Sequence, residues 1–105
     1  MELWKLDATA QAELIRSGDV TPRELVDCAI ERIEQLDPQL GALVDTRFER
    51  AREEAQGNLP NGPFRGVPML LKDAVQESAG DRYQHGTRFL RDRHYRPDSD
   101  TELVQ

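Results

Sequence analysis

The strongest structural signal in the sequence is a helix start at Thr21-Pro22-Arg23-Glu24. Threonine is a favoured N-cap, proline fits the first helical position, and a glutamate three residues after the cap completes a capping box. Apolar residues then recur at helical spacing and form one stripe, at Leu25, Val26, Ala29, Ile30, Ile33 and Leu36. The pattern predicts an amphipathic helix that ends at Asp37-Pro38, because proline disfavours helix in the residue before it.

Two shorter helices are expected on either side of this one. Asp7 can cap a helix from about Ala8 to Ser17, and Gly18 supplies the left-handed residue that commonly follows a helix. A third helix is expected from about Thr46 to Gln56, where apolar residues again share one side, with Gly57 after it. The first half of the chain is therefore predicted to be helical.

Residues 58–105 differ in texture from this helical part, residues 1–57. The stretch from Gly57 to Gly66 is dense in glycine, proline and asparagine and indicates a loop. The apolar run that follows, in "VPMLLK", is short and continuous, which is typical of a strand buried on both faces. We therefore expect an α/β fold with one clear strand, at about 67–72, that carries Lys72.

The remainder is polar, and no regular element is expected from Gln76 to Pro97 except a short extended piece near Thr87 to Leu90. A second capping box, Ser99-Asp100-Thr101-Glu102, then opens a helix that has only three further residues. Three residues cannot make a stable helix. The expectation is that these 105 residues are a fragment of a longer domain.

Composition excludes several classes of protein. The net charge is −6 and the pI about 4.9, which argues against nucleic acid or an anionic membrane surface as partner. A single cysteine, Cys28, allows no internal disulfide and fits the cytoplasm. The N-terminus lacks the apolar core of a secretory signal, and no run is long enough to span a membrane.

Lys72 is the main candidate for a catalytic residue, and two interpretations of it compete. In the first, the strand ends there and the ammonium group reaches water. In the second, Lys72 lies in a dry site as a proton acceptor, because burial or a neighbouring cation favours the neutral amine of a lysine. The spacing alone does not choose between them. Asp73, which follows directly, is expected to bond backbone groups in the next turn.

Two other clusters of residues are candidates for a binding site. His85 and His94 lie among aspartates, but their spacing fits no common zinc pattern, and the acidic run at 98–102 lacks the glycine and length of a calcium loop. We expect no metal and no cofactor. A basic stretch with aromatic residues interleaved runs from Arg82 to Arg96. It resembles nucleic-acid-binding segments, but the acidic remainder favours a solvated or ion-paired face.

Three segments, in order, carry a family resemblance. "GPFRGVPMLLKDAV" resembles the amidase signature segment that usually reads G-P-L-H-G-I-P, then hydrophobic residues, then K-D. "SGDVTPRELVDCAIERIEQLDPQLGAL" is similar to the N-terminal helices of that family. "AGDRYQHGTRFLRDRHYRPDSDTELV" is similar to the segment that follows the lysine. The resemblance covers nearly the whole chain, and no single motif carries it.

The resemblance implies an α/β/α sandwich around a mixed sheet, several hundred residues long, that hydrolyses or transfers amide C–N bonds. It implies a catalytic set of a serine nucleophile, a second serine at a cis peptide bond, and a lysine at the position of Lys72. That lysine acts as the base through the second serine. A serine hydroxyl is a poor nucleophile until a base takes its proton.

This sequence departs from the family pattern in one respect. The family's two serines and its glycine- and serine-rich loop come after the segment that ends at Gln105, and Ser17, Ser78 and Ser99 do not match the serine positions. The isolated chain is therefore expected to be inactive. The alternative is a non-catalytic helical module that binds a partner. The amide substrate, the oligomeric state, and the choice between a free-standing amidase and an amidotransferase subunit stay open.

Overall fold

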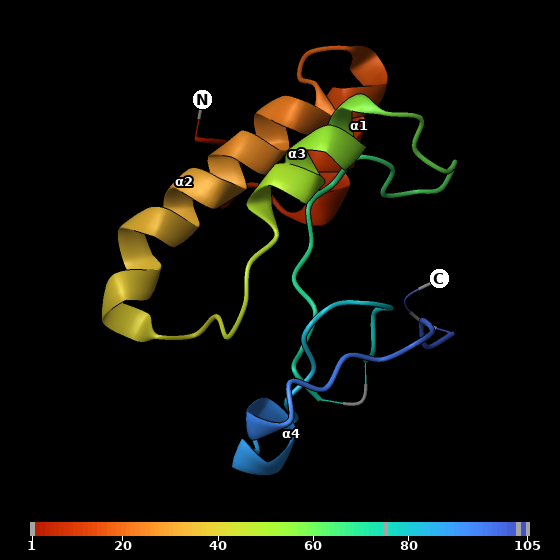
Figure 1. Cartoon of the computed structure of the whole chain (residues 1–105). Helices are drawn as coiled ribbons and strands as arrows, with labels where there is room; N and C mark the ends of the chain where they lie inside the picture. Colours follow the sequence, from red (N-terminus) through yellow and green to blue (C-terminus); the bar gives the residue numbers. More distant parts are fainter. Residues whose placement is uncertain (1, 75, 103, 105) are drawn as a thin grey trace. The chain divides into compact units, whose positions relative to one another are not determined.

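The computed structural model describes residues 2–74, 76–102 and 104 (Figure 1). The chain divides into two compact units, Met1–Met69 and Leu70–Gln105. The helices are, in order, the 3-10 helix η1 (Leu3–Lys5) and the α-helices α1 (Ala8–Ser17), α2 (Pro22–Leu40), α3 (Phe48–Gln56) and α4 (Arg88–Asp92). The first three α-helices belong to the first unit and α4 to the second.

The predicted starts of α1 and α2 are confirmed. The side chain of Asp7 accepts a hydrogen bond from the backbone N–H of Ala10 at 2.8 Å. The hydroxyl of Thr21 accepts one from the N–H of Glu24 at 3.1 Å. Each contact satisfies a backbone donor that the first turn of a helix leaves without a partner. Gly18 ends α1 with a φ of 82°, as expected for a left-handed cap.

The predicted end of α2 at Asp37-Pro38 is wrong, since the helix continues through Pro38 to Leu40. Gly41 then takes a left-handed conformation, with φ 61°, and its N–H donates to the carbonyl of Asp37 at 2.7 Å. The Asp37 carboxylate also accepts from the N–H of Ala42 at 2.7 Å. Asp37 therefore organises the chain beyond the proline and allows one more helical turn.

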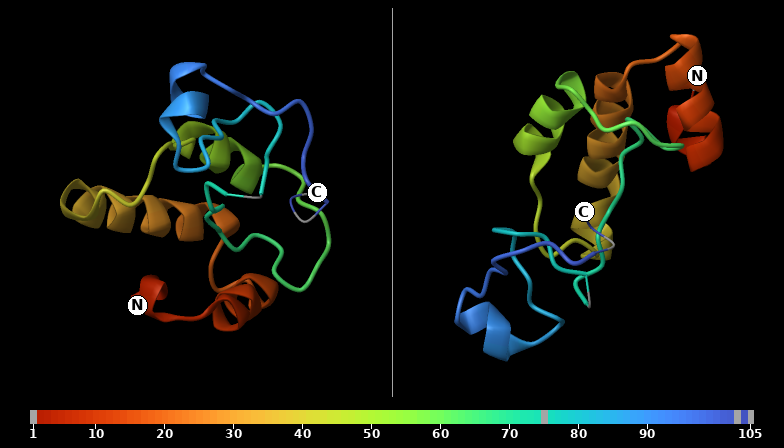
Figure 2. Two further views of the ribbon diagram at one scale, coloured as in Figure 1. Left: turned by 90° about the horizontal axis from the view of Figure 1, so that it is seen from below. Right: turned by 90° about the vertical axis from the view of Figure 1, so that its right-hand side faces the viewer.

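The core of the first unit lies along α2. In both views of Figure 2, α2 lies between α1 and α3. Leu25, Val26 and Ile30 of α2 are buried, and Ala12 of α1 is buried with them. α3 begins at Phe48, two residues later than the sequence predicted, and ends at Gln56 as expected. A loop follows, and the Arg16 guanidinium of α1 donates to its Pro63 carbonyl at 3.2 Å.

The predicted fold class is wrong for the described residues, which contain helices but no strand and no sheet. The expected strand at 67–72 is unpaired chain, in which Met69 is 76% and Leu70 67% exposed. A strand is defined by hydrogen bonds to a neighbouring strand. Nothing within the described residues supplies such a partner, so an apolar run alone does not become a strand.

The second unit is built mainly from loops joined by hydrogen bonds between distant backbone groups. The N–H of Gly80 donates to the carbonyl of Pro97, and the N–H of Thr101 to that of Glu77, each at 2.9 Å. Tyr83 is 9% exposed and forms its small apolar centre. Within the described ranges, no helix combines the length and hydropathy that a membrane crossing needs.

One sequence expectation about this second unit is corrected. The piece near Thr87 to Leu90 is not extended: Thr87 caps α4 by accepting from the N–H of Leu90 at 3.3 Å. The described part of the segment that begins at Ser99 is not helical, while Leu103 and Gln105 lie outside the described residues. A cap alone does not make a helix, because forming the first hydrogen-bonded turn is unfavourable and needs further helical residues after it.

Candidate active site

Lys72 lies near the start of the second unit and is exposed. Its backbone N–H donates to the side-chain oxygen of Gln76 at 3.3 Å. Its ammonium group makes no ion pair with the other described residues. Within the part of the chain described, these contacts do not choose between the two interpretations of Lys72.

Asp73 makes the most specific contacts next to Lys72. One carboxylate oxygen accepts from the backbone N–H of Gln84 at 2.7 Å, and the other accepts from the N–H of Gly86 at 3.3 Å. The expectation that Asp73 bonds backbone groups is confirmed, although the loop involved lies eleven and thirteen residues further along the chain rather than in the next turn.

The loop that receives Asp73 is itself tightly bonded. His85 and Gly86 both have positive φ, of 49° and 66°, and the His85 ring nitrogen Nδ1 lies 2.8 Å from the hydroxyl of Tyr83. The Thr87 N–H and hydroxyl both donate to the Gln84 carbonyl at 2.8 Å. His85 is thus engaged in the loop. Among the described residues, no three histidine, cysteine, aspartate or glutamate side chains gather as a metal site would require.

Two of the chain's three serines, Ser17 and Ser78, make local hydrogen bonds. The Ser78 hydroxyl donates to the carboxylate of Asp81 at 2.7 Å. The Ser17 hydroxyl donates to the Leu14 carbonyl at 3.1 Å and to the Asp19 carboxylate at 2.8 Å. A hydroxyl that donates to a carboxylate within its own turn is acting as a turn residue.

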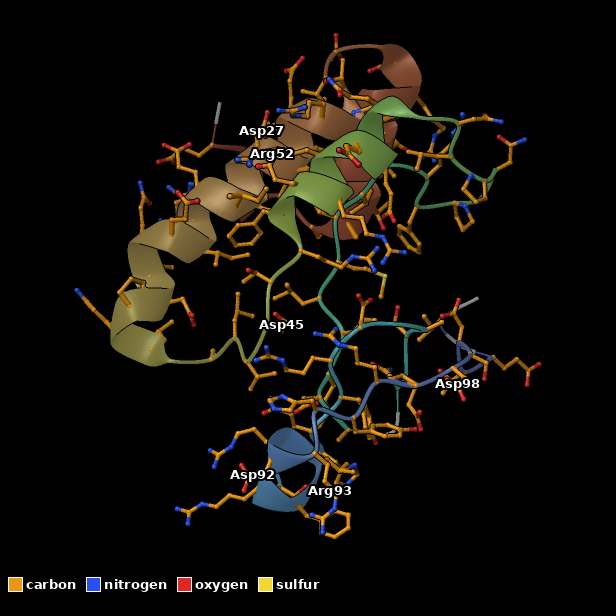
Figure 3. The ribbon with its side chains drawn as sticks, in the orientation of Figure 1. Asp27, Asp45, Arg52, Asp92, Arg93 and Asp98 are labelled. Atoms are coloured by element: carbon orange, nitrogen blue, oxygen red, sulfur yellow. The ribbon has the colours of Figure 1, made fainter. Side chains whose placement is uncertain are left out.

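The basic stretch around α4 is largely bonded within its own unit. Arg91 pairs with Asp92 at 3.2 Å, the Arg93 guanidinium lies 3.7 Å from the centre of the Phe89 ring, and Arg96 donates to a backbone carbonyl. Figure 3 shows Asp92 and Arg93 on this short helix. These contacts agree with a solvated or ion-paired face.

A small cavity of about 100 Å³ lies beside this stretch, lined by Arg82, Gln84, Leu90, Arg91, His94, Tyr95 and Arg96. Acidic groups adjoin it. The Tyr95 hydroxyl donates to the carboxylate of Glu77 at 3.1 Å, and this bond raises the pKa of Tyr95 above its usual value. The positive charge of the arginines is therefore partly offset at the cavity.

Comparison with known proteins gives the chain its relatives. It is 41% identical over all 105 residues to 6-aminohexanoate-cyclic-dimer hydrolase of Paenarthrobacter ureafaciens and of Pseudomonas sp. (strain NK87). It is 43% identical over 86 residues, 81% of its length, to the putative amidase AmiC of Mycobacterium tuberculosis (strain ATCC 25618 / H37Rv). The relatives of this chain are amide hydrolases. No family model matches.

A solved structure of 6-aminohexanoate cyclic dimer hydrolase in complex with substrate superposes on all of the chain with a TM-score of 0.88 at 41% identity. The relatives are much longer than the chain. It covers 21% of the cyclic-dimer hydrolases and 18% of AmiC, so it spans about a fifth of the length of the curated relatives that it matches. These similarities are consistent with an amidase-type family.

Proposed function

We propose that the chain is the N-terminal part of an enzyme of the amidase signature family, which hydrolyses amide C–N bonds with Lys72 as the base. The observation that supports the proposal most strongly is the 41% identity to a cyclic-dimer hydrolase over every one of the 105 residues. The superposition on a solved structure of 6-aminohexanoate cyclic dimer hydrolase, with a TM-score of 0.88, agrees with it.

In this proposal Lys72 takes a proton through a serine at a cis peptide bond from a second serine, the nucleophile. General bases of this kind contribute about 10²–10⁴-fold to a rate. Both serines, and the glycine-rich loop whose N–H groups hold the oxyanion, would come from sequence beyond these 105 residues. The exposed position of Lys72 among the described residues then has a simple reason, because the groups that enclose it belong to that sequence.

The test uses the complete protein that contains this chain, with 6-aminohexanoate cyclic dimer as the first substrate because the relatives are named for it. Lys72→Arg keeps the positive charge but cannot supply a neutral amine, so we expect kcat to fall by about 100-fold or more. The chain offers a matched control in Lys5, its only other lysine, which pairs with Glu2 at 2.5 Å in the first unit. Lys5→Arg should leave kcat within about twofold, as surface substitutions generally do.

Near-native turnover of Lys72→Arg would exclude Lys72 as the base. A second measurement concerns the 105-residue chain alone, which should hydrolyse no amide because it contains no activated serine. Turnover by the purified chain that disappears in Lys72→Ala would contradict the proposed division of the active site.

A further inference from the structure

The residue after the proposed base is fastened more firmly than the base itself. Both carboxylate oxygens of Asp73 accept backbone N–H groups, from Gln84 at 2.7 Å and from Gly86 at 3.3 Å. Hydrogen bonds to an ionised carboxylate are stronger than those between neutral groups. Asp73 is half-buried, whereas Lys72 is exposed. The chain is thus held at Asp73, one peptide bond away from the lysine.

The loop that holds Asp73 is fixed in turn. Tyr83, which is 9% exposed, anchors one side of it through the 2.8 Å contact with His85. On the other side, Thr87 bonds back to the Gln84 carbonyl and also caps α4. The two donors that Asp73 uses therefore belong to a loop that is tied to the buried tyrosine and to a helix.

We propose that Asp73 is a positioning residue for Lys72, because its carboxylate fixes the backbone beside the lysine by binding the N–H groups of Gln84 and Gly86. The inference rests on the proposed function of Lys72. With the Asp73 carboxylate held, the backbone beside Lys72 has less freedom, and the side chain of Lys72 remains to be oriented by its surroundings. A displacement of about 1 Å in a catalytic group can lower a rate by about 100-fold.

The contacts with Gln84 and Gly86 also engage the Asp73 carboxylate with groups other than the neighbouring Lys72. A carboxylate that pairs with a lysine favours the ammonium form, which cannot accept a proton. In the structure both oxygens of Asp73 are engaged by backbone donors, and Lys72 forms no ion pair with the described residues. The arrangement places an acidic residue next to the base without pairing the two.

The chain contains a matched control for this contact. The Asp100 carboxylate accepts from the backbone N–H of Ala79 at 2.7 Å, also within the second unit and also between residues far apart in sequence. Asp100→Ala therefore removes a similar bond that lies away from Lys72 in sequence, in the same way that Asp73→Ala removes the bonds of Asp73. A general loss of structure in the second unit should affect both variants, whereas loss of positioning should affect only Asp73.

The test compares Lys72→Ala, Asp73→Ala and Asp100→Ala in the complete protein. We expect Lys72→Ala to be inactive. Asp73→Ala should lose kcat by about tenfold or more with KM within about twofold, since binding does not need the base. Asp100→Ala should keep both constants within about twofold. In NMR spectra of the 105-residue chain, Asp73→Ala should move the Gln84 and Gly86 amide protons upfield, and Asp100→Ala should not.

The possible failures are distinguishable. If Lys72→Ala is inactive but Asp73→Ala keeps its kcat, or if Asp73→Ala and Asp100→Ala lose kcat equally, positioning by Asp73 is wrong and the proposed function stands. If Lys72→Ala keeps its activity, the proposed function is wrong and the positioning role is wrong with it. Should Asp73→Ala not fold, Asp73→Asn, which keeps the shape and one acceptor, decides by the same criteria.

Discussion

The Asp27 carboxylate of α2 accepts a hydrogen bond from Nε of Arg52 of α3 at 3.0 Å, although the two residues are 25 positions apart in sequence. Figure 3 shows the pair where the two helices lie side by side. Arg23, one turn before Asp27 on α2, donates to the same carboxylate at 2.9 Å. Asp27 therefore joins two arginines, one from its own helix and one from the helix packed against it.

These contacts predict an acid-sensitive step in the stability of the first unit. The hydrogen bond from Arg52 is the largest cause that lowers the pKa of Asp27 below its usual value of 3.8. A carboxyl with a lowered folded-state pKa stabilises the fold fully above its unfolded pKa, and this contribution is lost as the pH falls through the folded-state pKa. Thermal melts of α-helical circular dichroism should therefore show a falling melting temperature below about pH 4.

Asp27→Asn is the control for this step, because it keeps the shape of the side chain and cannot titrate. The variant should melt at a lower temperature than the wild type at pH 7, and its melting temperature should depend less on pH between about pH 4 and pH 2. Added salt should reduce the difference in melting temperature between the wild type and Asp27→Asn at pH 7, because screening weakens exposed ion pairs. Identical pH dependence of the two proteins would show that Asp27 does not link α2 to α3 in solution.

Leu25 should be the most costly apolar side chain to shorten. It is 2% exposed in the first turn of α2, and Leu25→Ala should lower the free energy of unfolding by about 2–5 kcal/mol. Leu40→Ala is a matched control at the end of the same helix, where the leucine is 69% exposed, and should change it by less than about 0.5 kcal/mol. Urea titrations followed by circular dichroism measure both. Equal effects would mean that α2 does not bury the face seen here.

Gly66 is a position where a side chain cannot be added without strain. Its φ is +86°, and a Cβ atom would lie 2.7 Å from Cγ of Pro22 and 3.1 Å from Cδ1 of Ile15. The left-handed backbone alone should make Gly66→Ala cost about 1–2 kcal/mol, and the contacts add to this. Gly62→Ala, in the same loop with no atom within 4 Å of the added Cβ, should cost less than about 0.5 kcal/mol. Urea titrations measure the free energy of unfolding of both variants. Equal losses in Gly66→Ala and Gly62→Ala would show that the loop does not lie against α1.

The parts of the fold that the sequence predicted well are those set by neighbours along the chain. The caps at Asp7 and Thr21 and the stop at Gly18 depend on residues within one turn, and the structure confirms all three. The cap at Thr87 is also a local signal, from which the start of α4 is predictable. The extension of α2 past Pro38 required knowledge of the Asp37 carboxylate contacts, which a propensity rule does not contain.

The candidate site was less predictable for the same reason. Lys72 is predicted to be the base from the resemblance to a family, because its spacing in the sequence alone does not separate a surface lysine from a base. The contacts of Asp73 with Gln84 and Gly86 cross a loop of more than ten residues. Sequence reasoning indicated that Asp73 would bond backbone groups, but the identity of those groups depends on how the loop folds back.

The predicted strand at 67–72 is the largest error, and it leads to a last prediction. Within this run Met69, Leu70 and Leu71 are exposed, at 76%, 67% and 41%. Exposed apolar runs promote self-association. Leu70→Gln in the 105-residue chain should therefore reduce oligomer formation, measured by sedimentation velocity over a range of concentrations. It should change the free energy of unfolding by less than about 0.5 kcal/mol, because an exposed side chain loses little packing.

Val26→Gln, at a side chain that is 8% exposed, is the contrasting variant and should unfold the first unit instead. A cost of more than about 1 kcal/mol for Leu70→Gln would show that the chain buries this run in solution.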